Sequence, residues 1–325
     1  MKKKAQILII ALWIMVILAV LAVSIGYRVS LALRLGSYQR EDLKSLYLAK
    51  SGVNQAIVEI NRDLTQTDSF SDSWAENEEA FKRIAFSQDS SEFASVSYTD
   101  SNGEEIFGVL DEERKININT AAEELLAVLL EKGGITAQES RDIASNIRAW
   151  RSNLEITPAE SRDYTALGYE CKGEPFTNCA ELTMVKGINQ QLYRAIEGIF
   201  TVFGNGGVNI NTAEPAALEV IIASAMNQAG ISDQAKLEGL LSAILRYRQD
   251  YGQFNEGDLD SLLRVLDLDP ADYELITVEL RKNLVVESDF FRIISKGRLG
   301  VGKPTRQIDC VYDREIKELI FWHES

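Results

Sequence analysis

The feature that most restricts the fold of this chain is an uninterrupted apolar run near its N-terminus, from Ile7 to Val23. Three lysines precede the run, and Arg28 is the first charged residue after it. A secretory signal needs only about 7–15 apolar residues before a small-residue cleavage site, whereas a membrane-spanning helix needs about 17–25. The run is therefore long enough to cross a bilayer.

The helical pattern continues beyond this run. Apolar residues recur at steps of mostly three or four between Leu31 and Ile60, and no proline interrupts residues 7–64. This spacing predicts one continuous helix from Ile7 to about Leu64, about 85 Å long at 1.5 Å per residue. A signal peptide that is discarded has no reason to merge with the first helix of the mature domain. The pattern thus favours a retained helix over a plain signal peptide, and an ordinary single-span anchor remains an alternative.

The distribution of charge indicates both topology and partners. The chain of 325 residues has 49 acidic and 34 basic residues, a formal net charge of −15, which disfavours nucleic acid or an anionic membrane surface as a partner of the soluble part. Lys2, Lys3 and Lys4 precede the span, where positive charge stays cytoplasmic, so the chain after Tyr27 is expected outside the cytoplasm.

This topology places the cysteines in an extracytoplasmic compartment, which permits disulfides. Cys171 and Cys179 are eight residues apart in a segment that reads as a loop, and we expect a disulfide between them. Cys310 lies in an alternating, strand-like segment and is expected to be a buried thiol.

The middle of the chain contains a repeated pattern. Residues 115–130 and 207–222 both contain Asn-Ile-Asn-Thr followed by an apolar, helix-forming run. Thr120 with Glu123 fits a capping box, and Thr212 is placed to cap the second helix. Asparagines beside a threonine could also belong to a polar active site, but the start of a helix explains them more simply.

The similarity between the two halves continues downstream. Residues 146–151 resemble 243–249, and residues 175–188 resemble 253–268. Each unit reads as about four short helices, so 116–283 is predicted to be a duplicated all-helical domain.

Residues 182–188 have the Leu-x-x-Val-x-Gly-Ile form of a helix-hairpin-helix, which can bind nucleic acid through backbone amides. Residues 111–200 contain 15 acidic and 10 basic residues, and 201–283 contain 13 and 6. Binding to phosphates needs clustered Lys and Arg, so we interpret the hairpin as scaffold. A DNA-binding or DNA-uptake membrane protein is the alternative.

Strand-like segments flank the helical region. Residues 92–116 alternate around an Asn102-Gly103 turn, a strong hairpin signal, and residues 288–322 predict two or three more antiparallel strands. The predicted class is α+β: a long N-terminal helix on an antiparallel sheet, with a large helical domain inserted as duplicated helix-hairpin-helix or SAM-like units.

In this arrangement the chain resembles the type II secretion system protein K family, also called general secretion pathway protein K, whose members are minor pseudopilins with a pilin-like fold. Four features carry the resemblance: the basic leader before an apolar helix containing Trp13, the string DEERKININTA at 111–121, the second NINTA at 209–213, and the pattern from Leu182 to Ile188.

The resemblance implies the following domain limits. Residues 1–5 are a basic leader, 6–26 the transmembrane part of the helix, 27–115 the first part of a pilin-like domain, 116–283 the inserted domain with repeats 116–200 and 208–283, and 284–325 the closing strands.

The resemblance also implies processing that retains the helix. Prepilin peptidase would cut between Ala5 and Gln6, and Gln6 would become the N-methylated first residue; most family members have glycine where Ala5 stands. The fifth mature residue is then Ile10, where typical pilins have a glutamate that meets the terminal amine of a neighbouring subunit. An apolar residue there suits a first, capping subunit that has no neighbour above it.

The expected function is that of a structural subunit at the pseudopilus tip. The resemblance implies that it initiates assembly and supports export of folded proteins across the outer membrane. Its expected partners are other minor pseudopilins, the inner-membrane assembly platform and prepilin peptidase. The expected location is the inner membrane, as a single-pass protein with a cytoplasmic N-terminus and a periplasmic bulk.

No enzyme activity is predicted, and no catalytic residue is assigned. His323 is the only histidine and lies two residues from the C-terminus, and the sequence contains no nucleophile, base or phosphate-loop pattern. No cofactor is expected, although some family members bind calcium in this domain. The candidate oxygen ligands are Glu155, Glu160, Asp163 and Glu170, which we interpret as solvated surface charges.

Overall fold

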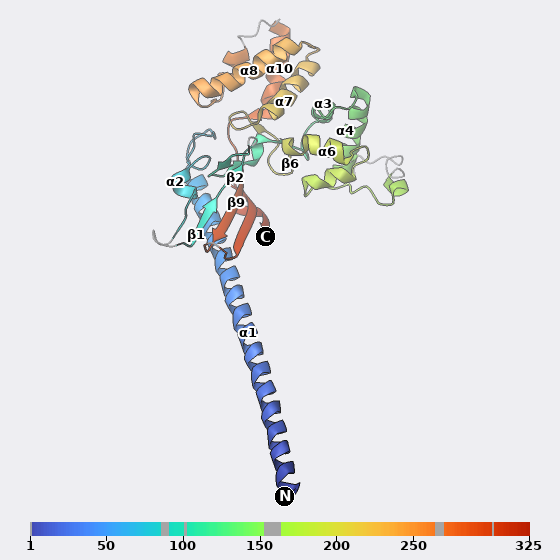
Figure 1. The fold of residues 1–325 in the computed structure, drawn as a ribbon. Helices are drawn as coiled ribbons and strands as arrows, with labels where there is room; N and C mark the ends of the chain where they lie inside the picture. The colour runs from blue at the N-terminus through green and yellow to red at the C-terminus, as the bar shows by residue number, and fades with distance from the viewer. Residues whose placement is uncertain (1, 86–90, 101–102, 153–163, 264–269, 301) are drawn as a thin grey trace.

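The computed structural model describes residues 2–85, 91–100, 103–152, 164–263, 270–300 and 302–325. It contains a long helix that projects from a small sheet, and a larger helical domain at the end of the molecule away from the N-terminus (Figure 1). We call the sheet and the part of the long helix that packs on it the body, and the helical part the inserted domain.

Helix α1 (Lys2–Arg62) confirms the prediction of one continuous N-terminal helix. Within the described residues it is the one helix long and apolar enough to cross a membrane. In the part of the chain that the structure describes, the N-terminal half of this helix packs against no other element, and Ile10 on it is 59 % exposed. Only the C-terminal part packs, where Ala49, Val53, Ala56 and Ile60 are buried against the sheet.

The helix lies unusually close to the sheet because glycines are present at the contact. A Cβ on Gly297 would lie 1.9 Å from the carbonyl oxygen of Ser45, and one on Gly52 would lie 2.1 Å from Ser295 Oγ. The approach allows Ser45 Oγ to donate to the carbonyl of Gly297 at 2.7 Å, and Ser295 Oγ to donate to the carbonyl of Ala49 at 2.8 Å.

The body contains an antiparallel sheet with the strand order β1-β9-β10-β11, and β4 also pairs with β9. The predicted closing strands are present. The hairpin predicted around Asn102 is β2 paired with β3; Asn102 itself lies outside the described residues, and Gly103 has φ +85°. The elements of the body besides α1 are α2 (Glu78–Phe81), β1 (Phe93–Val96), β2 (Tyr98–Thr99), β3 (Glu105–Ile106), β4 (Leu110–Asp111), β9 (Phe290–Arg298), β10 (Thr305–Asp313) and β11 (Glu318–Glu324).

The inserted domain consists of two units. Each unit begins with one short strand and ends with another, and these two strands pair in parallel. In the first unit β5 pairs with β6, and in the second β7 pairs with β8. The first unit contains β5 (Ile116–Asn117), α3 (Glu123–Lys132), α4 (Ala137–Arg151), the 3-10 helix η3 (Cys179–Met184), α6 (Gln190–Ile196) and β6 (Phe200–Thr201). The second contains β7 (Val208–Asn209), α7 (Pro215–Gln228), α8 (Gln234–Tyr251), α9 (Asp258–Leu263), α10 (Pro270–Asn283) and β8 (Leu284–Val285).

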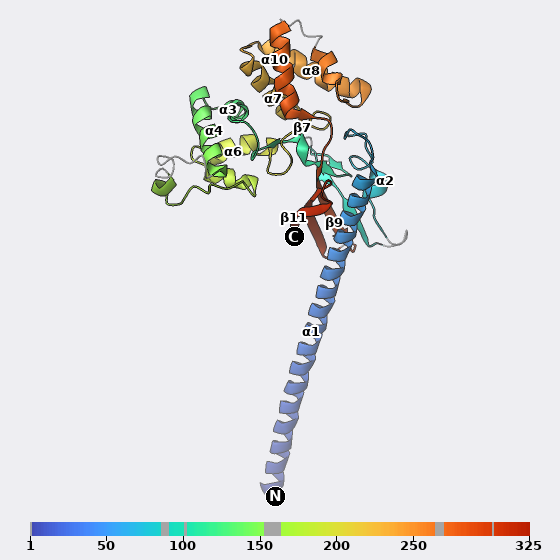
Figure 2. The same cartoon turned by 180° about the vertical axis from the view of Figure 1, so that it is seen from behind.

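The described residues form two separate hydrophobic cores. One lies between α1 and the sheet and includes Trp74 and Phe291, whose rings meet edge to face at 4.9 Å. The other runs through both units of the inserted domain without a break. The two units therefore form one helical domain, and both its chain connections lead to the body (Figure 2).

The predicted caps of α3 and α7 are wrong. The residues before these helices are Ala122 and Glu214, and neither makes a side-chain cap. Thr120 Oγ1 lies 3.4 Å from the carbonyl of Asn117, and Thr212 Oγ1 donates to Asp111 at 2.5 Å. Each threonine lies two residues too early because the Asn-x-Asn segment makes a turn before the helix begins.

Candidate functional site

Three consecutive acidic residues lie where the chain passes from the body into the inserted domain. Asp111, Glu112 and Glu113 are 1–4 % exposed. Asp111 is the last residue of strand β4, and Glu112 and Glu113 follow it directly; because β4 pairs with β9, their position is fixed at the end of the sheet. Together with Asp68, which is fully buried beside them, we call them the carboxylate junction.

Asp111 connects the body with the start of the second unit. Its Oδ2 accepts hydrogen bonds from Thr212 Oγ1 (2.5 Å), Ser288 Oγ (2.7 Å) and Asn209 Nδ2 (3.3 Å). Its Oδ1 accepts from the backbone N–H of Glu113 at 2.8 Å. One buried carboxylate thus holds β7, the segment after β8, and the end of β4.

Glu112 connects the end of the first unit with the sheet. Thr201 Oγ1, in β6, donates to its Oε2 at 2.5 Å, and the Arg292 guanidinium, in β9, donates to its Oε1 at 3.0 Å. Arg292 also forms two hydrogen bonds with Asp309 at 2.8 and 3.0 Å. The charge of Glu112 is therefore compensated although its side chain is buried.

Glu113 binds the backbone of two connecting segments. The N–H of Asn205, in the linker between the two units, donates to its Oε1 at 2.9 Å. The N–H of Asp289, where the chain returns to the sheet, donates to its Oε2 at 2.6 Å. Both carboxylate oxygens of Glu113 accept from backbone groups.

Asp68 adds the loop after α1 to the same junction. The Arg314 guanidinium donates to both of its carboxylate oxygens, at 2.9 and 2.7 Å, and the backbone N–H of Ser288 donates to it at 2.7 Å. Its carbonyl accepts from Asn209 Nδ2 at 3.0 Å. The carboxylate junction thus binds the segment that enters the inserted domain, the linker between its two units, and the segment that returns to the sheet.

The pKa values of the junction follow from burial and from the available cations. Burial raises the pKa of Glu113 to about 7 and that of Asp111 to about 6, against the hydrogen bonds that each accepts. Burial also raises the pKa of Asp68, against the effect of Arg314. Burial alone would raise the pKa of Glu112, but the charges of Lys115 and Arg292 outweigh this effect and lower the pKa overall.

We expect the full chain in detergent to become more stable as the pH falls from 8 to 5. A group whose pKa is raised on folding stabilises the fold below its unfolded pKa, and this contribution is lost as the pH rises through the folded pKa. For Glu113, raised from 4.5 to about 7, the contribution is on the order of 3 kcal/mol. Acidic groups with lowered pKa values, such as Glu181 (about 2), lose their contribution only at lower pH. Thermal unfolding at pH 5, 6, 7 and 8 measures how stability changes with pH. Glu113→Gln should reduce this pH dependence. An equal pH dependence in the variant would contradict the raised pKa of Glu113.

The asparagines of the repeated segment bind a loop in the interior of each unit. Asn119 Nδ2 donates to the carbonyl of Phe176 at 3.0 Å and its Oδ1 accepts from the N–H of Phe176 at 2.7 Å. Asn211 makes the same pair of contacts with Phe254, at 3.2 and 2.6 Å. Side-chain bonds to both backbone groups of one residue fix the loop, so these asparagines are structural.

The helix-hairpin-helix glycine turn packs against its own domain. The N–H of Lys186 donates to Tyr164 Oη at 3.2 Å, and Asn146 Nδ2 donates to the carbonyl of Lys186 at 3.0 Å. The backbone next to Gly187 therefore takes part in packing, which agrees with the scaffold interpretation.

The structure forms no disulfide between Cys171 and Cys179. Cys171 Sγ lies 3.5 Å from the carbonyl of Ala149, and Cys179 Sγ lies 3.7 Å from that of Phe200. The two thiols contact different elements, α4 and β6, and the disulfide between them stays a prediction. Cys310 is fully buried in β10, as predicted.

The remaining predicted site residues lie apart from the junction. The Ala5–Gln6 bond is in the first turns of α1 and Ile10 is on its open part. Glu155, Glu160 and Asp163 lie outside the described residues, and Glu170 is exposed. The sequence patterns assign no role to the junction acids; three consecutive acids beside the repeated asparagines are the signal that marks them.

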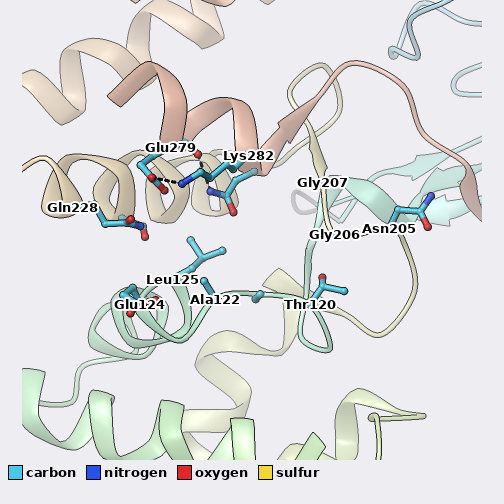
Figure 3. A pocket seen from close by; sticks show the side chains of 13 residues that line it. Thr120, Ala122, Glu124, Leu125, Asn205, Gly206, Gly207, Gln228, Glu279 and Lys282 are labelled. Atoms are coloured by element: carbon cyan, nitrogen blue, oxygen red, sulfur yellow. Dashed lines mark hydrogen bonds and ion pairs between the residues drawn. The ribbon is translucent and has the colours of Figure 1, made fainter. Parts of the chain in front are cut away.

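A cleft of about 400 Å³ lies between the two units (Figure 3). Its walls come from the start of α3, the linker around Gly206, and helices α7 and α10. Lys282 Nζ donates to Glu279 Oε1 on the same helix at 2.5 Å, so the two charges compensate each other.

A long apolar helix packed on an antiparallel sheet, with a helical domain inserted before the closing strands, defines a pilin-like protein that carries an insertion. Residues 104–205 match the family model described as type II secretion system (T2SS), protein K. This region contains the three junction acids and the first unit. The match, together with the fold, supports membership of the type II secretion system protein K family.

A solved structure has the same fold over nearly the whole chain. It is a chain in the crystal structure of the GspK–GspI–GspJ complex from the enterotoxigenic Escherichia coli type 2 secretion system, with a TM-score of 0.63 and 17 % sequence identity. The likeness covers 90 % of this chain and 99 % of that one. No curated protein matches the sequence.

Proposed function

We propose that the protein is a minor pseudopilin of a type II secretion system, a structural subunit that supports export of folded proteins across the outer membrane. The observation that carries this proposal is the family match over the first unit, in a chain whose whole layout is pilin-like. The alternative of DNA binding finds no support in the comparisons. The inserted domain is acidic, and its hairpin turn is packed.

Shape supports our proposal that the chain lies at the pseudopilus tip. The inserted domain extends beyond the sheet at the end of the molecule opposite the N-terminus (Figure 1). In a helical assembly whose subunits align their α1 helices, this bulk would occupy the place of the next subunit. A chain of this shape can begin an assembly but cannot lie within its shaft.

The partners follow from the same proposal. α1 would anchor the chain in the inner membrane after cleavage between Ala5 and Gln6 by prepilin peptidase, and the inner-membrane platform would assemble it. The solved structure that it resembles contains GspK in complex with GspI and GspJ. Counterparts of GspI and GspJ in the same secretion system are therefore the neighbours that we propose for this chain.

The test is deletion and complementation in the producing bacterium. Deletion should abolish release of exported proteins into the medium, and the full chain should restore it. A chain whose junction is intact but whose α1 lacks residues 7–23 should fail to restore it. Normal secretion in the deletion strain would overturn the proposal. A mobility-shift assay with duplex DNA at moderate salt should show no complex.

Ile10→Glu tests the tip position. An unpaired carboxylate in lipid costs several kcal/mol unless it is protonated, so we expect weaker membrane insertion or initiation. We expect no incorporation into the shaft, because the inserted domain still prevents stacking. Secretion assays and immunolabelling of pseudopili measure both effects, with Ile10→Leu as the control. Labelling along the shaft by the Ile10→Glu protein would contradict the tip position.

For calcium we propose that the acidic residues Glu155, Glu160, Asp163 and Glu170 are solvated and hold no structural ion. The melting temperature of the full chain in detergent should then be the same in EDTA and in millimolar calcium. A decrease in EDTA that calcium restores, and that Glu170→Gln removes, would show a site instead.

A further inference from the structure

The C-terminal strand β11 forms an open edge of the sheet. Within the described residues it pairs with β10 only. Its side chains are largely apolar and exposed: Leu319 and Ile320 are each 41 % exposed and Trp322 is 39 % exposed. Ile316, in the turn before the strand, is 55 % exposed. An edge strand with this composition is rare, because unpaired backbone groups beside apolar side chains favour pairing with another chain.

The direction of the unpaired backbone groups follows from the register. Gln307 and Ser325 exchange two backbone hydrogen bonds of 2.9 Å. Residue pairs in an antiparallel ladder alternate between hydrogen-bonded and non-hydrogen-bonded. Trp322 is opposite Cys310 and Glu324 is opposite Ile308, so both belong to non-hydrogen-bonded pairs. Their N–H and C=O groups therefore point away from β10, to the open side.

The usual means of protecting an edge are weak here. Natural edge strands carry proline, central lysines or inward charges, but the acidic residues Glu318 and Glu324 lie at the two ends of β11, and the strand contains no proline or lysine. The register shift opposite Val311 and Tyr312 affects only the first half of the strand. The second half is regular and open.

Side chains of α1 contact β11 next to this edge. Lys50 Nζ lies 5.8 Å from the ring centre of Tyr47, 5.7 Å from that of Trp322, and 3.5 Å from Glu324. Trp322 Nε1 donates to Glu324 Oε1 at 3.0 Å. These contacts orient the Trp322 ring and hold β11 close to α1, so the edge is already ordered in the single chain.

The open backbone decides what can cover this surface. A helix lying on it would bury the N–H and C=O groups of Trp322 and Glu324 without partners, which costs about 1–3 kcal/mol for each group. An extended strand would pair with the same groups and place alternate side chains on Leu319, Ile320 and Trp322. A strand is thus the element that covers the apolar side chains and satisfies the backbone together.

We propose that β11 is a strand-addition site, covered in the assembled protein by the edge strand of one neighbouring pilin-like subunit. This inference rests on the proposed function, in which a neighbour anchored through its own N-terminal helix would lie parallel to α1 with its sheet beside β11. It assigns the interface to the C-terminal edge of the sheet, in addition to contacts between the long helices.

The test uses the full chain in nanodiscs, with the full-length GspI and GspJ counterparts of the same system as probes. Hydrogen exchange of the Trp322 and Glu324 amides should be fast in the chain alone and at least tenfold slower in the complex. The matched variants are Glu324→Pro, which removes the outward N–H, and Glu324→Ala, which keeps it. Pro should weaken capture of the neighbour about tenfold relative to Ala.

The outcomes separate this inference from the proposed function. If the neighbours bind but neither amide is protected, the strand-addition site is wrong and the proposed function stands. If the wild-type chain binds neither counterpart, both are overturned. Equal capture by the Pro and Ala variants also overturns the inference. If Glu324→Pro does not fold, as judged by exchange of the β9 and β10 amides, protection in the wild-type complex decides alone.

Discussion

Gly297→Ala is expected to separate α1 from the sheet. The added Cβ would lie 1.9 Å from the backbone oxygen of Ser45 and 2.7 Å from the backbone nitrogen of Ala49. Neither atom can move without shifting the helix. The hydrogen bond from Ser45 Oγ to the carbonyl of Gly297 would also be lost. Overpacking of this kind costs about 1–3 kcal/mol when side chains can yield, so with backbone atoms we expect about 3 kcal/mol or more.

The matched control is Gly36→Ala, which adds the same methyl group where nothing lies within 4 Å. An exposed helical Gly→Ala change is neutral or stabilising by up to about 1 kcal/mol. Thermal unfolding in detergent should show a large decrease for Gly297→Ala and none for Gly36→Ala. Similar melting temperatures for the two variants would show that α1 does not pack on the sheet as described.

Asp111→Ala is expected to loosen the inserted domain from the body. The change removes the acceptor shared by Thr212, Ser288 and Asn209, and leaves the N–H of Glu113 without its partner. Removing the acceptor of several buried donors costs about 3–5 kcal/mol. Because both hydrophobic cores remain, we expect the two parts to stay folded while the connection between them becomes mobile.

Hydrogen exchange measures this prediction directly. The amides of Asn205 and Asp289, which bind Glu113, should exchange faster in Asp111→Ala, while amides in α7 and β10 should keep their protection. Asp111→Asn should have a smaller effect, since it keeps an oxygen for the N–H of Glu113. Glu124→Ala, at an exposed position of α3, is the control. Unchanged exchange at Asn205 and Asp289 would contradict the role of the junction.

Much of the architecture was predictable because it depends on local periodicity. The long helix, the hairpin around Gly103, the closing strands and the duplicated helical region each follow from apolar spacing or from turn residues. The family resemblance rests on short strings, such as DEERKININTA and the second NINTA, that local patterns also distinguish. The comparisons confirm the resemblance and the fold class.

The wrong capping predictions have a physical cause. Thr120 and Thr212 lie almost at the spacing of a cap, but the turn made by each Asn-x-Asn segment moves the start of the helix. Thr212 donates instead to Asp111, a partner 101 residues away. The Cys171–Cys179 disulfide rests on separation along the chain alone and stays a prediction.

The sequence by itself determined the membrane-length helix, the order of the elements and the acidic, duplicated character of the inserted domain, because these depend on neighbouring residues along the chain. Only the tertiary structure decided the role of Asp111, Glu112 and Glu113, whose partners are 89–180 residues away. It also decided that Gly297 lies under Ser45 and that β11 is an open edge. Contacts of this range depend on how the two cores are placed, and no local pattern encodes that placement.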